Sequence, residues 1–292
     1  MKDFDKFTNE LINKLESQLD GVTVSVQDVT KNNGLKLCGL QIRNECNVAP
    51  VIYINDFYEQ YKVGKSLDRI CEDIKVSYFK HQPVHDFDVL KVSSFNNVKS
   101  EIVYELINYE KNEELLQNVP YIPFLDLAIV FKIVISEFEN VVGTILIHNT
   151  LLEMWEVGLD ELYAYANENT RKVYGVEFIS MSECLSGMLN IEFFEQSEYK
   201  LPMYILTNGR RVNGASCLLY DGLLDKISES FQDDLCIIPS SVHECIIIPV
   251  SVIDPKEIKN TVKFVNSTEL ALDEILSDNV YFYSREKGEV LI

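Results

Sequence analysis

Residues 22–42 read VTVSVQDVTKNNGLKLCGLQI, and this stretch predicts a β-hairpin. Valine alternates with polar residues at its start, as in a strand that buries one face. The Asn32-Asn33-Gly34 segment follows, and Asn and Gly accept the positive φ angles that tight hairpin turns require. Residues 35–42 then form the returning strand.

Further elements flank the hairpin on both sides. Residues 3–19 space their apolar side chains three and four apart, which predicts a helix before the hairpin. A third strand is expected at 51–54, a short aromatic helix at 56–62, and a longer helix after Ser66, a residue type that caps helix starts. The first 80 residues therefore predict the order α-β-β-β-α.

Several double-stranded-RNA-binding modules share this order of elements. The helix after Ser66 carries Asp68, Glu72 and Asp73 but no basic cluster at its start. Double-stranded RNA is bound largely through phosphate and sugar contacts, so these acidic side chains argue against RNA as the partner.

The remainder of the chain predicts a second lobe, which gives an α+β fold in two lobes, residues 1–118 and 119–292. Residues 86–118 favour helix, with Val103, Leu106 and Ile107 as core candidates. Near-continuous apolar runs at 235–239 and 245–249 are typical of strands buried on both faces. We expect a C-terminal mixed sheet flanked by helices, among them one spanning 217–231.

The chain is strongly acidic, with a net charge of −20 over 292 residues. Residues 1–117 contain 19 acidic and 14 basic side chains, whereas residues 118–292 contain 27 and 12. Such a surface repels phosphate backbones and anionic lipid, so direct nucleic-acid binding through a basic face and membrane association are not expected. The acidity serves solubility or, in a sharper interpretation, mimics nucleic acid and occupies a basic protein.

The seven cysteines are odd in number and include no C-x-x-C pair. Several lie in apolar runs, where a free Cys behaves as a small hydrophobe. This pattern is typical of a reducing compartment and argues against a zinc site or a disulfide framework. The polar N-terminus shows no signal-peptide pattern, so we expect a cytoplasmic protein.

Short stretches spread over nearly the whole chain together resemble a known protein family. They are 29–34, 58–61, 108–112, 124–128, 206–208, 213–216, 239–244 and 276–281. Through them the chain resembles a bacterial family of unknown function, whose members are typical of gut anaerobes and often look like mobile-element cargo. The C-terminal half is also distantly similar to the YtpQ family. Neither resemblance implies a catalytic residue or a substrate.

The segment 239–244 is the first candidate site. Ser240 or Ser241 beside His243, with Glu244 orienting the imidazole, provides the residue types of nucleophilic catalysis. Nothing here resembles the G-x-S-x-G elbow that exposes a nucleophile. A Ser-Ser-x-His turn also commonly satisfies its own backbone through hydroxyl hydrogen bonds, and we favour that structural interpretation.

The segment 208–216 is the second candidate, a polar loop that precedes a predicted helix. Its candidate ligand-binding residues are Asn208, Arg210, Arg211, Asn213, Gly214 and Ser216. Backbone N–H groups at a helix start can hold an anion with help from arginine. The alternative, which we favour, is a surface loop built from turn-forming Asn and Gly. We expect this loop and residues 239–244 to lie close together.

No cofactor fingerprint is present, and no metal site is predicted. His81 and His85 have the spacing of zinc ligands on a helix, but Pro83 between them argues against a regular helix. We therefore expect a non-enzymatic binding or regulatory protein that acts through a protein partner with a basic surface. The alternatives are a hydrolase using Ser240 or Ser241 with His243, and a small-anion sensor at 208–216.

Overall fold

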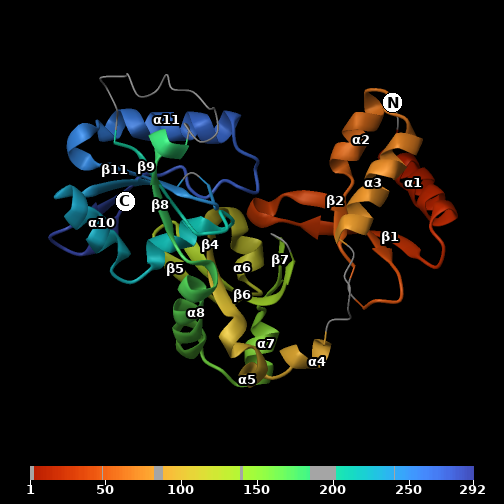
Figure 1. Cartoon of the computed structure of the whole chain (residues 1–292), viewed down its shortest axis with the longest axis horizontal. Coiled ribbons are helices and arrows are strands. Elements are labelled where there is room, and N and C mark those ends of the chain that lie inside the picture. The colour runs from red at the N-terminus through yellow and green to blue at the C-terminus, as the bar shows by residue number, and fades with distance from the viewer. Residues whose placement is uncertain (1–2, 48, 82–87, 139–140, 185–201, 240) are drawn as a thin grey trace. The chain divides into compact units, whose positions relative to one another are not determined.

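The computed structural model describes residues 3–47, 49–81, 88–138, 141–184, 202–239 and 241–292. The chain forms two compact units, residues 1–89 and 90–292 (Figure 1). Both units combine helices with antiparallel sheets, which confirms the predicted α+β class. No helix in the described part of the chain has both the length and the apolar character needed to cross a membrane.

The first unit has the predicted order, including the short helix expected at 56–62. Its elements are α1 (Phe4–Gln18), β1 (Thr23–Thr30), β2 (Lys36–Arg43), β3 (Val51–Tyr53), α2 (Asn55–Lys62) and α3 (Leu67–His81). The strands form one antiparallel sheet in the order β1-β2-β3. Asp3 caps α1, because its side chain accepts a hydrogen bond from the Asp5 N–H at 3.1 Å.

The hairpin turn lies where the sequence predicts it, in the 3₁₀ segment η1 (Asn32–Gly34). Asn33 and Gly34 both have positive φ angles, 58° and 70°. The Lys31 N–H donates to the Leu35 carbonyl at 2.8 Å and closes the turn. This turn sets the register that pairs Val24 with Ile42 on the buried face of the sheet.

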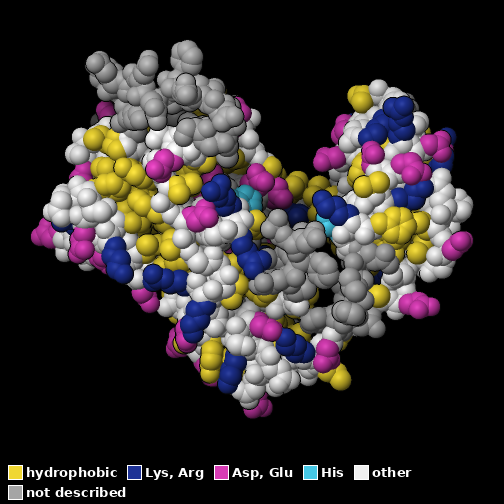
Figure 2. All heavy atoms as spheres, in the orientation of Figure 1, with side chains coloured by type: hydrophobic (Ala, Val, Ile, Leu, Met, Phe, Trp, Pro, Cys, Tyr) yellow, Lys and Arg dark blue, Asp and Glu magenta, His cyan; other side chains and the backbone are white. Residues whose placement is uncertain are grey.

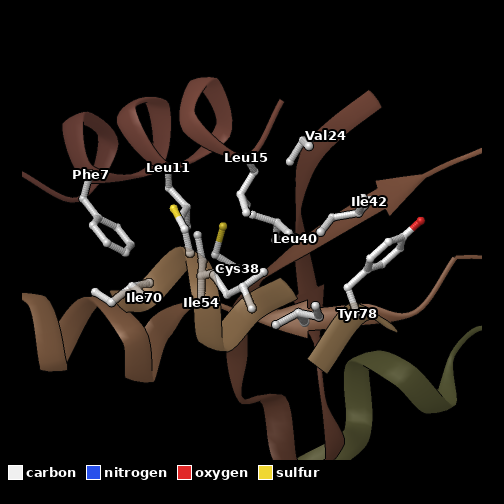
Figure 3. Packing of buried hydrophobic residues seen from close by; sticks show 13 residues of the cluster. Phe7, Leu11, Leu15, Val24, Cys38, Leu40, Ile42, Ile54, Ile70 and Tyr78 are labelled. Carbon is white, nitrogen blue, oxygen red and sulfur yellow. The ribbon is translucent and has the colours of Figure 1, made fainter. Parts of the chain in front are cut away.

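The core of the first unit is apolar. Figure 3 shows Phe7, Leu11 and Leu15 of α1 projecting from one side and Leu40 and Ile42 of β2 facing them. Helix α3 contributes further fully buried side chains from its own apolar face to the same cluster. The helical spacing in the sequence therefore identifies the buried faces correctly.

The second unit begins with a four-stranded sheet built around one long strand. Its strands are β4 (Ile102–Asn108), β5 (Tyr121–Phe124), β6 (Leu127–Phe138) and β7 (Val141–Leu146). Strand β6 pairs with β4 on one side and with β5 and then β7 on the other. Residues 139–140, between β6 and β7, lie outside the described residues.

The prediction of a helix at 86–118 is wrong over its central part, where β4 forms instead. Val103, Leu106 and Ile107 are buried as expected, with exposed fractions of 2%, 2% and 4%. β-branched and aromatic side chains cover both faces of this strand, and tertiary pairing with β6 decides its conformation. A boundary at 118–119 would separate β4 from β6, so the units instead meet between Val89 and Leu90.

A six-stranded sheet forms the rest of the second unit. Its strands are β8 (Glu177–Ser180), β9 (Tyr204–Thr207), β10 (Leu235–Ile238), β11 (Cys245–Pro249), β12 (Tyr281–Ser284) and β13 (Glu289–Leu291). They lie in the order β13-β12-β10-β11-β9-β8. Every pairing in the described part is antiparallel, so the expected mixed sheet is not found. The six residues between β10 and β11 are too few for a parallel crossover.

Helices cover these two sheets. They are α4 (Val89–Val92), α5 (Phe95–Val98), α6 (Glu113–Leu116), α7 (Asn149–Trp155), α8 (Leu159–Tyr174), α10 (Leu223–Phe231) and α11 (Pro255–Thr268), with 3₁₀ segments η2 (Lys99–Glu101), η3 (Glu110–Asn112), η5 (Gly214–Leu219) and η6 (Val250–Val252). Helix α8 packs against β4, and α11 places Val262 on the six-stranded sheet. The single helix expected at 217–231 is divided into η5 and α10, because Gly222 has a φ of 66°.

Candidate functional site

The two predicted polar loops meet at the end of β9. The Asn213 N–H donates to Nδ1 of His243 at 3.2 Å, and the Ala215 N–H donates to the Val242 carbonyl at 3.2 Å. The Thr207 hydroxyl donates to the His243 carbonyl at 2.7 Å. These contacts confirm the expected proximity of residues 208–216 and 239–244.

Gly214 allows the two loops to approach this closely. A Cβ atom at this position would lie 2.1 Å from the Thr207 hydroxyl oxygen and 2.5 Å from the His243 carbonyl oxygen. Asn213 before it has a φ of 52°, which Asn adopts more readily than most residues. The Asn-Gly pair is therefore required by backbone geometry at the contact between the loops.

Asn208 organises the loop from within. It is 1% exposed, and its Oδ1 accepts hydrogen bonds from the N–H groups of Arg210 at 3.0 Å and Val212 at 3.4 Å. Its Nδ2 donates to the Val212 carbonyl at 2.7 Å. The side chain thus replaces backbone partners inside the turn, as Asn commonly does.

The amides expected to hold an anion donate to protein acceptors. Besides those of Arg210 and Val212, the Arg211 N–H donates to the Asn208 carbonyl at 3.0 Å. The Ser216 N–H and hydroxyl both donate to the Asn213 carbonyl, at 3.4 and 3.0 Å. These hydrogen bonds stabilise the loop conformation and occupy the donors that an anion would need.

The two guanidinium groups of the loop also have protein contacts. Arg211 Nε lies 3.0 Å from Glu177 Oε2. The Arg210 guanidinium lies over the Tyr174 ring, 5.9 Å from its centroid.

The Ser–His pair has a geometry different from that of a catalytic dyad. Ser241 is 6% exposed, and its hydroxyl oxygen accepts from the His243 N–H at 3.0 Å. Because His243 Nδ1 accepts from a backbone N–H, the imidazole presents Nε2 outward, 3.7 Å from Glu274 Oε1. Glu244 is half-buried beside this turn, and Ser240 lies outside the described residues.

A carboxylate that the sequence does not single out completes this cluster. Asn213 Nδ2 donates to Glu105 Oε2 at 2.7 Å, and Glu105 Oε1 lies 2.5 Å from Lys132 Nζ. The Glu105 side chain is 13% exposed. It belongs to β4, so this contact joins the loop after β9 to the four-stranded sheet. Sequence reasoning missed Glu105 because a single charged residue in a strand carries no local signal.

A second hydrogen-bonded cluster surrounds Asp126. Its Oδ2 accepts from the Ser277 hydroxyl at 2.6 Å and from Asn279 Nδ2 at 3.0 Å, and its Oδ1 accepts from the Tyr281 hydroxyl at 2.5 Å. Burial, and then the hydrogen bond to Asp126, raise the pKa of Tyr281. Asn108 Nδ2 donates to the Leu276 carbonyl at 2.9 Å and adds a further link.

Six of the stretches through which the chain resembles a known family contribute to these two clusters. Residues 206–208, 213–216 and 239–244 supply the first cluster, and 108–112, 124–128 and 276–281 supply the second. In the second cluster, side chains bind backbone groups or one another across the junction of the two sheets. In the first cluster, they join loops of the six-stranded sheet, and the Asn213–Glu105 contact crosses to the four-stranded sheet. The side chains of these stretches therefore hold the loops in fixed conformations through hydrogen bonds.

A pair of tyrosines marks a separate surface of the second unit. The rings of Tyr109 and Tyr121 are edge to face, with centroids 5.8 Å apart and hydroxyl oxygens 3.5 Å apart. The contact with Tyr121 chiefly raises the pKa of Tyr109, and the nearby Glu113 carboxylate makes a smaller contribution in the same direction. Glu110 and Glu114 are exposed on the same short segment. We call these five residues the tyrosine–glutamate patch.

Sequence reasoning did not identify this patch. Its signal is the Tyr109-Glu110 pair four residues before Glu114, but Tyr121 reaches it only through the turn into β5. The structure does not test the His81–His85 spacing, since His85 lies outside the described residues. The His81 ring nitrogen Nδ1 lies 2.9 Å from the Ser77 carbonyl oxygen.

Comparison with known proteins identifies the family. Among curated proteins and among solved structures, none matches the chain. A family model described as "Family of unknown function (DUF5688)" matches residues 4–285. The match says nothing about the YtpQ family. Because it covers nearly the full length of both units, the chain belongs to the DUF5688 family of unknown function.

Proposed function

We propose that this chain is a non-enzymatic binding protein that holds a basic segment of a partner protein on its second unit. The charge distribution carries the proposal. Residues 1–89 contain 14 acidic and 11 basic side chains, whereas residues 90–292 contain 32 and 15, a net charge of −17. Figure 2 shows Asp and Glu side chains spread over the visible faces. Such a field attracts basic partners and repels nucleic acid.

The tyrosine–glutamate patch is the surface on which we place the contact. Tyrosine faces attract Lys and Arg side chains, by about 0.5–1 kcal/mol at exposed sites. Glu110, Glu113 and Glu114 add carboxylates, and none of the three forms an ion pair with another described residue. Aromatic rings beside unpaired carboxylates suit a Lys- or Arg-containing segment better than they suit an anion or an apolar helix.

The contacts of the polar loops argue against the two alternative functions. A hydrolase using Ser241 and His243 needs a hydrogen bond between hydroxyl and imidazole, but the described hydroxyl oxygen accepts from backbone. A small-anion sensor at 208–216 needs free amides, but Arg210, Arg211 and Val212 donate theirs to Asn208. Both alternatives would require these loops to rearrange.

We also propose a cytoplasmic location for the chain. All seven cysteines are free thiols, and five of them are buried. Burial raises the pKa of the thiols of Cys217 and Cys236 to about 12, which disfavours the reactive thiolate. A reducing compartment is the ordinary environment for such cysteines.

The binding proposal is tested with a defined probe, a 12-residue peptide of alternating Lys and Gly, by fluorescence anisotropy. A triple variant, Glu110→Lys, Glu113→Lys and Glu114→Lys, is compared with the unaltered chain. We expect binding at 50 mM salt that 0.5 M salt strongly weakens, and a loss of about tenfold or more in the variant, which corresponds to about 1.4 kcal/mol.

A matched control separates the patch from general acidity. Glu153→Lys, Glu269→Lys and Glu286→Lys change the net charge equally at exposed positions elsewhere on the second unit. We expect the control variant to bind at least five times more tightly than the patch variant. Equal losses in the two variants, or binding that salt does not affect, would contradict the proposal.

A further inference from the structure

A surface cavity of about 490 Å³ lies beside α8 and shares no lining residue with either polar cluster. Asn167, Glu168, Arg171 and Lys172 of α8 line one side. The segment 220–221, between η5 and α10, lines the other. The volume falls within the usual range for small-molecule sites, about 300–1,000 Å³.

The charges that line the cavity are balanced but not fully paired. Glu168 and Lys172 form an ion pair one turn apart on α8. Arg171 and Asp221 remain, and neither forms an ion pair within the described part of the chain. The cavity therefore presents one uncompensated positive group and one uncompensated negative group to whatever occupies it.

Both of these groups are held against a fixed wall. Asp221 Oδ2 accepts from Asn167 Nδ2 at 3.1 Å, and Asn167 Oδ1 accepts from the buried Tyr104 hydroxyl at 3.4 Å. The Arg171 guanidinium lies over the Tyr220 ring, 5.9 Å from its centroid. Tyr220 is 4% exposed, and its hydroxyl donates to the Gly175 carbonyl at 3.2 Å.

This wall limits how far the charged side chains must reorganise on binding. The orientation of the Asn167 amide is fixed, because its Oδ1 accepts from the Tyr104 hydroxyl while its Nδ2 donates to Asp221. Tyr220 gives the Arg171 guanidinium a flat aromatic surface to pack against. Preorganised polar groups of this kind convert more of their contact energy into affinity.

We infer that this cavity binds a small zwitterion of the free α-amino-acid class. Its carboxylate would pair with the Arg171 guanidinium, which matches carboxylate geometry through two parallel N–H donors. Its ammonium group would pair with the Asp221 carboxylate. A simple anion that pairs with Arg171 would be repelled by the Asp221 carboxylate. A simple cation that pairs with Asp221 would be repelled by the Arg171 guanidinium. The inference does not rest on the proposed protein-binding function.

The test is a thermal-shift screen of the full chain against the twenty standard L-amino acids, each at 10 mM, followed by calorimetric titration of any that stabilises it. We expect at least one to raise the Tm, because a ligand that binds only the folded chain stabilises it. The matching carboxylic acid without its amine, and the matching amine without its carboxylate, should each bind at least tenfold more weakly.

Two variants and two matched controls locate the site. Arg171→Gln and Asp221→Asn should each weaken binding at least tenfold, and both positions are exposed, so both variants should fold. Lys226→Gln and Glu229→Gln remove the same charges from exposed positions on α10 and should leave binding unchanged. No stabilisation by any of the twenty amino acids, or equal binding by all four variants, would overturn the inference.

Discussion

The interiors of the two units differ in what holds them together. In the first unit, α1, α3 and the three-stranded sheet meet through an apolar cluster that includes Phe7, Leu11 and Leu40 (Figure 3). In the second unit, eleven described polar residues are buried, and several of them bind the loops between strands. Apolar packing is non-directional, whereas hydrogen bonds fix particular loop conformations, so the second unit specifies its loops more tightly.

The largest expected effect of a single substitution lies in the first unit. Leu11 is fully buried in α1, and Leu11→Ala should lower the free energy of unfolding of this unit by about 3 kcal/mol. Trp155, the single tryptophan, lies in the second unit, so its fluorescence reports on that unit alone.

Urea titrations followed by circular dichroism and by Trp155 fluorescence check this separation. The dichroism transition should move to lower urea in Leu11→Ala, while the fluorescence transition stays in place. An equal shift of both transitions would show that the two units unfold together in one cooperative transition. That result would contradict the separation of their interiors.

Alkaline pH should weaken the second unit through its buried thiols. Burial raises the pKa of Cys236 from an ordinary value of 9.0 to about 12. Below pH 9 the thiol keeps its proton in both states, so its full contribution to stability is present. Between pH 9 and pH 12 the unfolded chain loses a proton that the folded chain keeps, and the free energy of unfolding falls by about 1.4 kcal/mol per pH unit.

The measurement compares the unaltered chain with Cys236→Ala from pH 9 to pH 11 by Trp155 fluorescence in urea. Over these two pH units the unaltered chain should lose about 2.5 kcal/mol more than the variant. Other buried thiols and tyrosines add the same background slope to both proteins. Parallel pH profiles would contradict the assigned shift.

Gly214→Ala tests the close approach between the two polar loops. The new Cβ would meet the His243 carbonyl oxygen at 2.5 Å and the Asn208 amide nitrogen at 2.7 Å, so backbone must shift. We expect a loss of about 2 kcal/mol from the free energy of unfolding of the second unit. Gly158→Ala is the control, since nothing lies within 4 Å of its added Cβ and it should cost under about 1 kcal/mol. Similar stability of the two variants would refute the close contact.

Local patterns predict the first unit well and the second unit less completely. The turn at Asn32–Gly34 and the amphipathic faces of α1 and α3 depend on neighbours within a few residues, so the sequence contains their signal. Strand β4 was predicted as a helix because its partner, β6, is distant in the sequence. The boundary between the units was misplaced for the same reason.

The candidate site shows the same limit. Asn208, Asn213 and His243 were recognised as polar loop residues, and their proximity was expected. Their role was not, because a hydrogen-bond partner such as Glu105 lies on another sheet and leaves no local pattern. The tyrosine–glutamate patch and the cavity beside α8 were missed because each forms from segments that only the folded chain brings together.

The central claim is that the polar loop residues of the second unit hold its two sheets together. A double-mutant cycle with Asn213→Gly and Glu105→Ala tests it most directly, since Gly accepts the positive φ at this position. Followed by Trp155 fluorescence in urea, the cycle should give a coupling energy of about 1.5 kcal/mol, whereas Asn213→Gly with the distant Glu153→Ala should be additive within about 0.5 kcal/mol. A coupling energy of zero between Asn213 and Glu105 would contradict the claim.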